Sequence, residues 1–178
     1  MAEPNSPLPP AGGAGGGPET PHSPTPNLSR EREGNRYRFR DDPAADEPAV
    51  SLDAFFDQPD AVSVRIEAGD DVRRLGPVLE RVRLVEVDFP KFRDGRGFSS
   101  ARVLREMGYT GEIKATGDVL VDLVFFMRRC GFDSFAPNVP FNDADVQAAL
   151  ARYPHVYQHA ADDTVPIWKL RHPEATNG

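Results

Sequence analysis

The sequence predicts an α/β fold built from parallel βα repeats, and two observations support this prediction. Short runs with alternating apolar residues, typical of strands, take turns with stretches whose apolar residues recur at helical spacing. The strand-like runs begin near residues 62, 84, 112 and 133, so one βα unit follows another every 21 to 28 residues. Strands that alternate with helices in this way favour a parallel sheet with right-handed crossovers.

The first two units supply clear strand patterns. Residues 62–66 alternate apolar and polar side chains, and the helix that follows is expected to begin near Leu75, because Pro77 fits best in a first turn. The second strand, residues 84–89, is stopped by Pro90. After a loop, Ser99 or Ser100 is expected to cap a helix that runs through Met107.

The next two units are shorter. We expect a central strand over residues 112–115, a helix over residues 119–130 that is capped by Asp118 and closed by Gly131, and a fourth strand over residues 132–135. Asn142 or Asp143 is expected to cap a last clear helix. The segment around Trp168 is ambiguous and is a candidate for one more strand.

Composition divides the chain into three parts. Residues 1–48 hold 10 of the 18 prolines and 6 of the 15 glycines, so we predict a disordered Pro/Gly/Arg-rich tail. An α/β domain over residues 49–160 and a C-terminal extension over residues 161–178 follow. The tail carries a cluster of arginines that is either a solvated linker or a partner-binding arm: Arg30, Arg32, Arg36, Arg38 and Arg40.

Four βα units allow two architectures. They form either a small open three-layer sheet or a partial, TIM-barrel-like half barrel, whose open edges would favour a homo-oligomer. In both, the ligand site is expected at the carboxyl ends of the strands. Acidic, basic and hydroxyl side chains follow strands two and three, and we take these as candidate substrate-binding residues: Asp88, Lys91, Arg93, Arg96, Ser99, Ser100, Thr116 and Asp118.

The loop over residues 89–100 is the most informative segment, because it places three cations and two glycines before a helix N-terminus. Such a start offers free N–H groups and a positive dipole end, and Arg grips an oxyanion with two donors. The loop is therefore a candidate anion site. In the competing interpretation, Arg93 and Arg96 pair with nearby carboxylates, Gly95 and Gly97 only permit the turn, and Asp118 is only a helix cap.

Charge and cysteine content exclude several classes. The net charge of -7 argues against general nucleic-acid binding, and apolar runs are too short for a membrane span. One cysteine, Cys130, permits no internal disulfide and no iron–sulfur cluster. No secretory signal pattern is present, so we expect a cytoplasmic protein. His155 and His159 lack a convincing third ligand, so no metal is predicted, and the residues identify no cofactor.

Three segments together resemble a known bacterial family. They are FPKFRDGRGFSSAR at 89–102, GYTGEIKATGDVL at 108–120 and FFMRRCGFD at 125–133, and they are similar to the family called domain of unknown function 934. The resemblance covers roughly residues 50–160. It implies a role in sulfur assimilation, as an oxidoreductase component of sulfite reduction.

The resemblance and the residues together lead to two hypotheses. In the first, the chain is an accessory protein of assimilatory sulfite reduction whose basic loop binds a small oxyanion and whose partner is sulfite reductase or another sulfur-assimilation protein. In the second, it is a small enzyme that acts on a sulfur oxyanion or a phosphorylated metabolite. The sequence leaves open whether the chain is catalytic.

Overall fold

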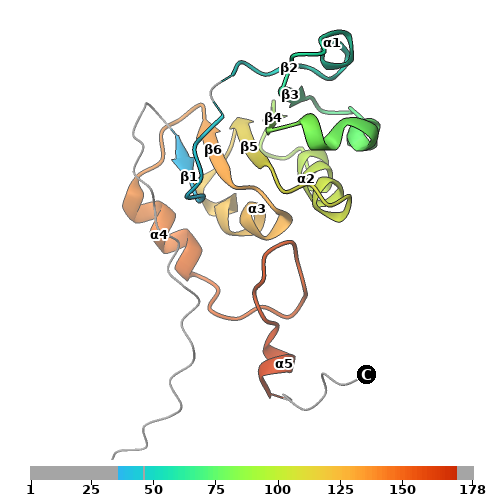
Figure 1. Ribbon diagram of the computed structural model, residues 1–178. Coiled ribbons are helices and arrows are strands. Elements are labelled where there is room, and N and C mark those ends of the chain that lie inside the picture. The colour runs from blue at the N-terminus through green and yellow to red at the C-terminus, as the bar shows by residue number, and fades with distance from the viewer. Residues whose placement is uncertain (1–35, 46, 172–178) are drawn as a thin grey trace, which may run out of the picture.

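The computed structural model describes residues 36–45 and 47–171. In these residues six strands form one sheet in the order β1-β6-β5-β4-β3-β2, which Figure 1 shows from one edge to the other. β2 to β6 are parallel, and β1 pairs with β6 in the antiparallel sense. The strands are β1 (Tyr37–Arg38), β2 (Val50–Ser51), β3 (Ser63–Ile66), β4 (Leu84–Phe89), β5 (Glu112–Gly117) and β6 (Ser134–Pro137).

The described residues form five α-helices and two 3-10 helices, and all except the last α-helix pack on one face of the sheet. They are α1 (Leu52–Asp57), α2 (Arg96–Glu106), α3 (Val124–Cys130), α4 (Asp143–Ala151) and α5 (Ile167–Arg171), together with the 3-10 helices η1 (Val72–Arg81) and η2 (Val121–Leu123). Because β2 to β6 follow one another in sequence order, right-handed crossovers place every connecting helix on the same side. The predicted α/β fold with an open parallel sheet is confirmed. Helices on a single face give it the winding of a barrel segment, whereas the three-layer arrangement considered as the alternative would have helices on both faces.

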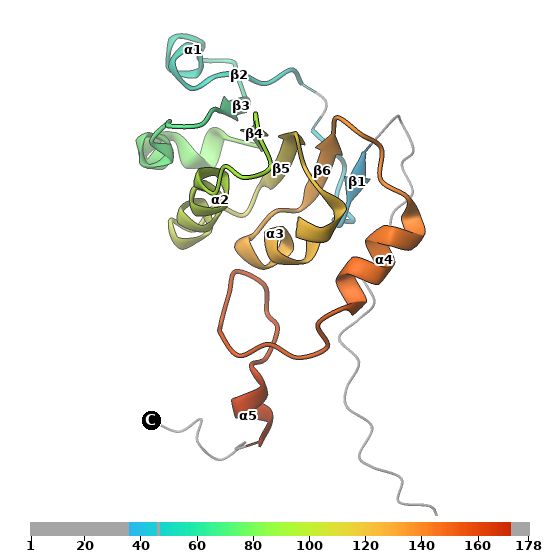
Figure 2. The ribbon, with the colours of Figure 1, turned by 180° about the vertical axis from the view of Figure 1, so that it is seen from behind.

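Alternation along the strands explains why one side takes the helices. The core joins buried residues of α1, η1, α2, α3 and α4 to one set of strand positions. Those strand positions are Val64 and Ile66 of β3, Val85, Val87 and Phe89 of β4, Ile113 and Ala115 of β5, and Phe135 of β6. α5 lies apart from the sheet in both views (Figures 1 and 2).

The opposite face of the sheet is polar. One row crosses five strands in register and consists of Arg65, Glu86, Lys114, Ser134 and Arg38. Glu86 stands between two cations in this row, 3.2 Å from Arg65 and 3.2 Å from Lys114. Parallel strands covered on both faces are usually apolar throughout, so the alternation in β4 and β5 is itself a sign that helices cover one face.

The N-terminal boundary differs from the prediction. Most of the tail predicted over residues 1–48 lies outside the described residues, as do Arg30 and Arg32. For residues 36–38 the disorder prediction is wrong, since Tyr37 and Arg38 form β1 on the edge of β6. Composition missed this pairing because two residues are too few to give a strand pattern, and their partners lie almost a hundred residues away.

Several helix starts also differ from the prediction. η1 begins at Val72, with Asp71 as its cap, and not near Leu75 as predicted. Because it is a 3-10 helix, it accommodates Pro77 in its interior. α2 begins at Arg96, so Ser99 and Ser100 lie inside it. η2 and then α3 follow Asp118, which caps neither helix. The predicted cap Asn142 is confirmed, since its Oδ1 accepts a hydrogen bond from the Ala144 amide at 2.9 Å.

Two elements near the C-terminus are displaced from the predictions. β6 begins two residues later than expected, at Ser134, because Gly131 in the left-handed conformation ends α3 and Phe132 turns back into the core. The segment around Trp168 forms α5, so the additional strand considered there is wrong. The indole N–H of Trp168 donates to the carbonyl of Tyr157, which ties this short helix to the preceding loop.

Candidate functional site

The carboxyl ends of β4, β5 and β6 meet at one edge of the sheet, and backbone hydrogen bonds hold their loops together. Phe89 pairs with Gly117, and Gly117 pairs with Pro137. The Asp118 amide donates to the carbonyl of Phe89 at 2.7 Å, and the Asn138 amide donates to the carbonyl of Gly117 at 2.8 Å. Three consecutive loops are therefore fixed relative to one another.

Asp118 positions the β4–α2 loop. Its Oδ2 accepts a hydrogen bond from the Phe92 amide at 3.1 Å. The close approach of the two strands depends on Gly117, which has a φ of 92° and whose added Cβ would lie 2.5 Å from the carbonyl oxygen of Phe89. The predicted helix cap is thus a side chain that ties two neighbouring loops together.

The side chain of Asp94, in the β4–α2 loop, contacts the first residue of α2. Asp94 Oδ1 accepts a hydrogen bond from the Arg96 amide at 3.1 Å, and its Oδ2 lies 2.6 Å from the Arg96 guanidinium. These hydrogen bonds lower the pKa of Asp94 to about 2. Gly97 permits close helix packing, because an added Cβ would meet the Phe89 ring at 2.5 Å. The pairing of Arg96 that the competing interpretation expects is therefore present.

Lys91 and Arg93 differ from Arg96. Both side chains are exposed, and neither forms an ion pair with a carboxylate in residues 36–45 and 47–171. The Arg93 guanidinium lies 5.3 Å from the centre of the Phe92 ring. The carboxylates near this edge accept hydrogen bonds from groups other than Lys91 and Arg93. Asp94 accepts from Arg96, Asp118 accepts from the Phe92 amide, and Asp88 accepts from the Thr116 hydroxyl at 3.3 Å.

The remaining predicted residues separate into two groups. Asp88 and Thr116 are half-buried neighbours on the polar face of the sheet, directly before the edge. Ser99 is exposed on α2, and the Ser100 hydroxyl donates back to the carbonyl of Arg96 within the same helix. Six predicted residues thus lie in or beside the three tied loops, whereas the two serines belong to α2.

Sequence reasoning missed the charged row behind this edge. Glu86 and Lys114 are largely buried side chains on the two central strands, and Asp88 and Thr116 follow them two residues further along the same strands. The signal was available in the alternation of LVEVDF and EIKATG, where every second residue faces away from the core. The alternation alone does not show that these charges lie next to one another, because that depends on the pairing of strands that are far apart in the chain.

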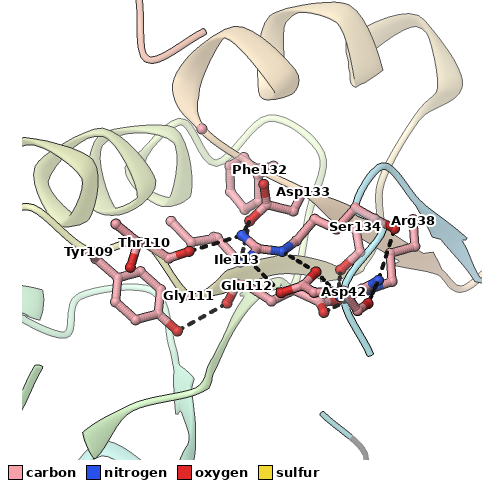
Figure 3. A network of polar contacts seen from close by, with 12 residues as sticks. Arg38, Asp42, Tyr109, Thr110, Gly111, Glu112, Ile113, Phe132, Asp133 and Ser134 are labelled. Atoms are coloured by element: carbon pink, nitrogen blue, oxygen red, sulfur yellow. Dashed lines mark hydrogen bonds and ion pairs between the residues drawn. The ribbon is translucent and has the colours of Figure 1, made fainter. Parts of the chain in front are cut away.

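A second polar cluster lies at the opposite, amino end of β5. Glu112, almost fully buried, accepts from Arg38 Nε at 2.8 Å and from the Ser134 hydroxyl at 2.5 Å (Figure 3). Asp42 accepts from Arg38 and Arg40, and these hydrogen bonds hold the pKa of Asp42 well below its usual range. The cluster fastens the segment around β1 to the rest of the sheet.

Asp133 and Arg105 complete this cluster. The Arg105 guanidinium contacts Asp133 at 2.5 Å and donates to the carbonyls of Tyr109 and Gly111 at 2.7 and 2.9 Å. The Ile113 amide donates to the same Asp133 carboxylate at 2.9 Å (Figure 3). These contacts fix the turn before β5, and their roles are structural.

An open groove of about 1010 Å³ lies beside the second cluster. One wall comes from residues 38–45 and Glu47, and the other from η1, its following residues and the end of α2 with the loop to β5. Its charged side chains already pair with one another, as Arg38 does with Glu112 and Arg40 with Asp42. Arg83 and Glu80 at the rim are exposed.

Other candidate chemistries find little support in the part of the chain that the structure describes. It contains no group of three or more His, Cys, Asp or Glu side chains arranged to hold a metal. Cys130 is half-buried against the core, and burial raises the pKa of its thiol. No helix among the described residues has the length and apolar character needed to cross a membrane.

The comparison with protein families identifies the group. The model of a family described as bacterial protein of unknown function, DUF934, matches residues 63–168. The chain belongs to the DUF934 family. No curated protein and no solved structure matches it. Within the DUF934 chain, the matched residues include β3 to β6 and all three tied loops, whereas β1 and the groove wall formed by residues 38–45 and Glu47 lie outside them.

Proposed function

We propose that this DUF934 protein is an accessory component of sulfite reduction that binds a small oxyanion at the β4–α2 loop. The observation that carries the proposal is the pair of exposed cations, Lys91 and Arg93, which have no carboxylate partner in the described residues. They stand at the carboxyl edge of a parallel sheet, where α/β proteins bind their ligands. The sulfur chemistry comes from the family resemblance.

Local charge supports an anion as the ligand. Residues 89–107 carry a net charge of +3, since five basic residues oppose Asp94 and Glu106, although the whole chain carries -7. The N-terminus of α2 adds its positive dipole end to the same side. A Lys and an Arg two residues apart give both a point charge and a two-donor fork for oxyanion oxygens.

The groove at the opposite end is the less suitable place for this function. Its buried charges are already neutralised by one another, so a charged ligand would have to replace existing ion pairs. One of its walls also lies outside the residues that the family model matches. A function common to the family is better supported by residues within 63–168, which include Lys91 and Arg93.

Calorimetric titration with sulfite, sulfate and phosphate tests the oxyanion site. We expect the Lys91→Ala/Arg93→Ala double variant to bind about tenfold more weakly or worse, because two charge-assisted contacts are lost. The control is Arg171→Ala, which removes an exposed cation of α5, the helix that lies apart from the sheet. Arg83→Ala reports on the groove, and loss of oxyanion binding in that variant alone would move the site there.

A second candidate function follows from the Asp88–Thr116 pair. These side chains are half-buried directly behind the edge, and a carboxylate in such a place is suited to proton transfer. The chain would then be a small enzyme acting on a sulfur oxyanion or a phosphorylated metabolite. Turnover by the isolated chain that disappears in Asp88→Asn, with folding and oxyanion affinity retained, favours this candidate over an accessory role.

A further inference from the structure

The three tied loops also expose apolar side chains, one from each loop. Phe92 in the β4–α2 loop is 37% exposed, Leu120 after β5 is 40% exposed, and Val139 after β6 is 74% exposed. Large apolar side chains on a sheet edge are unfavourable in water, and clustered ones mark interaction sites. We name these three residues the apolar tips.

The apolar tips stand on a rigid base. Phe92 is held through its own amide by Asp118, Leu120 follows Asp118 by two residues, and Val139 follows the hydrogen-bonded Asn138. A surface whose backbone is already fixed loses little conformational entropy when a partner binds. The arrangement therefore has the preorganisation of a docking face.

The charges beside the apolar tips indicate the chemistry of the partner. Lys91 and Arg93 flank Phe92 in the chain, and the acids of the three loops are engaged by other donors. An exposed aromatic ring between two cations suits an apolar pocket with an acidic rim. An anionic lipid surface is a poorer match, because lipid-binding segments usually carry clusters of about four to eight basic residues, whereas Lys91 and Arg93 are two.

We infer that the apolar tips dock this chain onto an acidic surface of a partner protein, where the acidic rim and an oxyanion compete for Lys91 and Arg93. The inference rests on the proposed function in two respects: the oxyanion bound by the two cations, and the choice of sulfite reductase as the partner to be tested. The apolar tips and the two cations have different roles. The tips supply the apolar contact, and the cations face the acidic rim and set the orientation of the complex.

Biolayer interferometry with purified sulfite reductase tests the docking face. The tip variant carries Phe92→Ser, Leu120→Ser and Val139→Ser, and we expect it to bind at least about tenfold more weakly, with wild-type binding weakened by salt. The matched control carries Tyr157→Ser, Val165→Ser and Leu170→Ser, three exposed apolar residues of the C-terminal segment. Circular dichroism checks that both variants fold.

The outcomes separate this inference from the proposed function. Equal binding by the wild type and the tip variant, or no binding of sulfite reductase at all, overturns the docking face while sulfite titration still judges the oxyanion site. Tip-dependent docking without any sulfite binding supports the docking face and refutes the oxyanion site. Tip-dependent binding to phosphatidylcholine–phosphatidylglycerol vesicles, or tip-dependent self-association in ultracentrifugation, assigns the tips to a membrane or a second copy and overturns the inference.

Discussion

The contribution of a charged side chain to the stability of this protein depends on whether the side chain is exposed to water. The Glu112 carboxylate is withdrawn from water, and Arg38 and Ser134 supply the hydrogen bonds that water would otherwise make. The Asp42 carboxylate takes part in the same cluster, but half of its side chain remains exposed. A buried ion pair is costly to break because the remaining charge stays without a partner, whereas an exposed pair exchanges its partner for solvent.

The Glu112→Gln variant is expected to lose about 2 to 3 kcal/mol of unfolding free energy, because Arg38 keeps a charge in a largely buried place. Asp42→Asn serves as the control and is expected to lose less than about 1 kcal/mol, since solvent compensates the exposed pair. Urea unfolding measures both. Equal losses in the two variants would show that burial of Glu112 does not govern the energetics of the cluster.

The pH dependence of Asp94 gives a second test at this scale. Arg96 lowers the pKa of Asp94 from 3.8 to about 2, so the pair adds stability above the ordinary carboxyl value and loses it as pH falls toward 2. Carboxyl ¹³C NMR should give a midpoint near 2 for Asp94. In Arg96→Gln the midpoint should move up toward 3.8, whereas Arg73→Gln should leave it in place.

At the scale of elements, short contacts decide how the strands and loops meet. β4 and β5 end side by side because Gly117 adopts a left-handed conformation and lets the Phe89 carbonyl approach. Gly95, at the start of α2, is different: its φ is -73° and no atom lies within 4 Å of an added Cβ. Two glycines that look equivalent in the sequence therefore have opposite requirements.

Gly117→Ala is expected to destabilise the protein by about 2 kcal/mol or more, through backbone strain and the clash with Phe89. Gly95→Ala is expected to be neutral or to stabilise it by about 0.5 kcal/mol, because the native backbone already suits an alanine. Thermal unfolding of the pair measures the difference. A similar effect at both positions would contradict the tight approach of β4 and β5.

The bounds of strands and helices could be predicted from sequence patterns in some places and not in others. β4 was predicted with its observed bounds, because six alternating residues between a charged turn and Pro90 leave little choice. The start of α2 was misplaced because Ser99 and Ser100 are good caps in isolation, while the actual start depends on Asp94 reaching the Arg96 amide. Of the candidate site, the acids and cations after β4 and β5 were foreseen, but Glu86 and Lys114 were not.

For the whole molecule, the segment before the matched family region contributes to folding. β1 covers the edge of β6, and Arg38 neutralises Glu112 from outside the matched residues. β1 and β2, which follow one another in the chain, lie at opposite edges of the sheet. Removal of this segment would expose a strand edge and leave a buried carboxylate without its cation.

A chain that starts at residue 49 is accordingly expected to be less stable than one that starts at residue 36, by at least as much as Glu112→Gln. Its open β6 edge should also favour association. Urea unfolding and light scattering on the two shortened chains measure these effects. Equal stability and a monomer in both cases would show that the domain begins at residue 49, as composition suggested.

The sequence by itself determined the local features: the βα rhythm, the strand faces, the basic loop and the exclusion of disulfide or iron–sulfur chemistry. These depend on the spacing of neighbouring residues, which a single chain displays directly. The tertiary structure decided which charges remain available. Arg96 is engaged by Asp94, whereas Lys91 and Arg93 are not paired in the described residues, and Asp118 ties loops instead of capping a helix. Such pairings depend on distances between segments that only folding brings together.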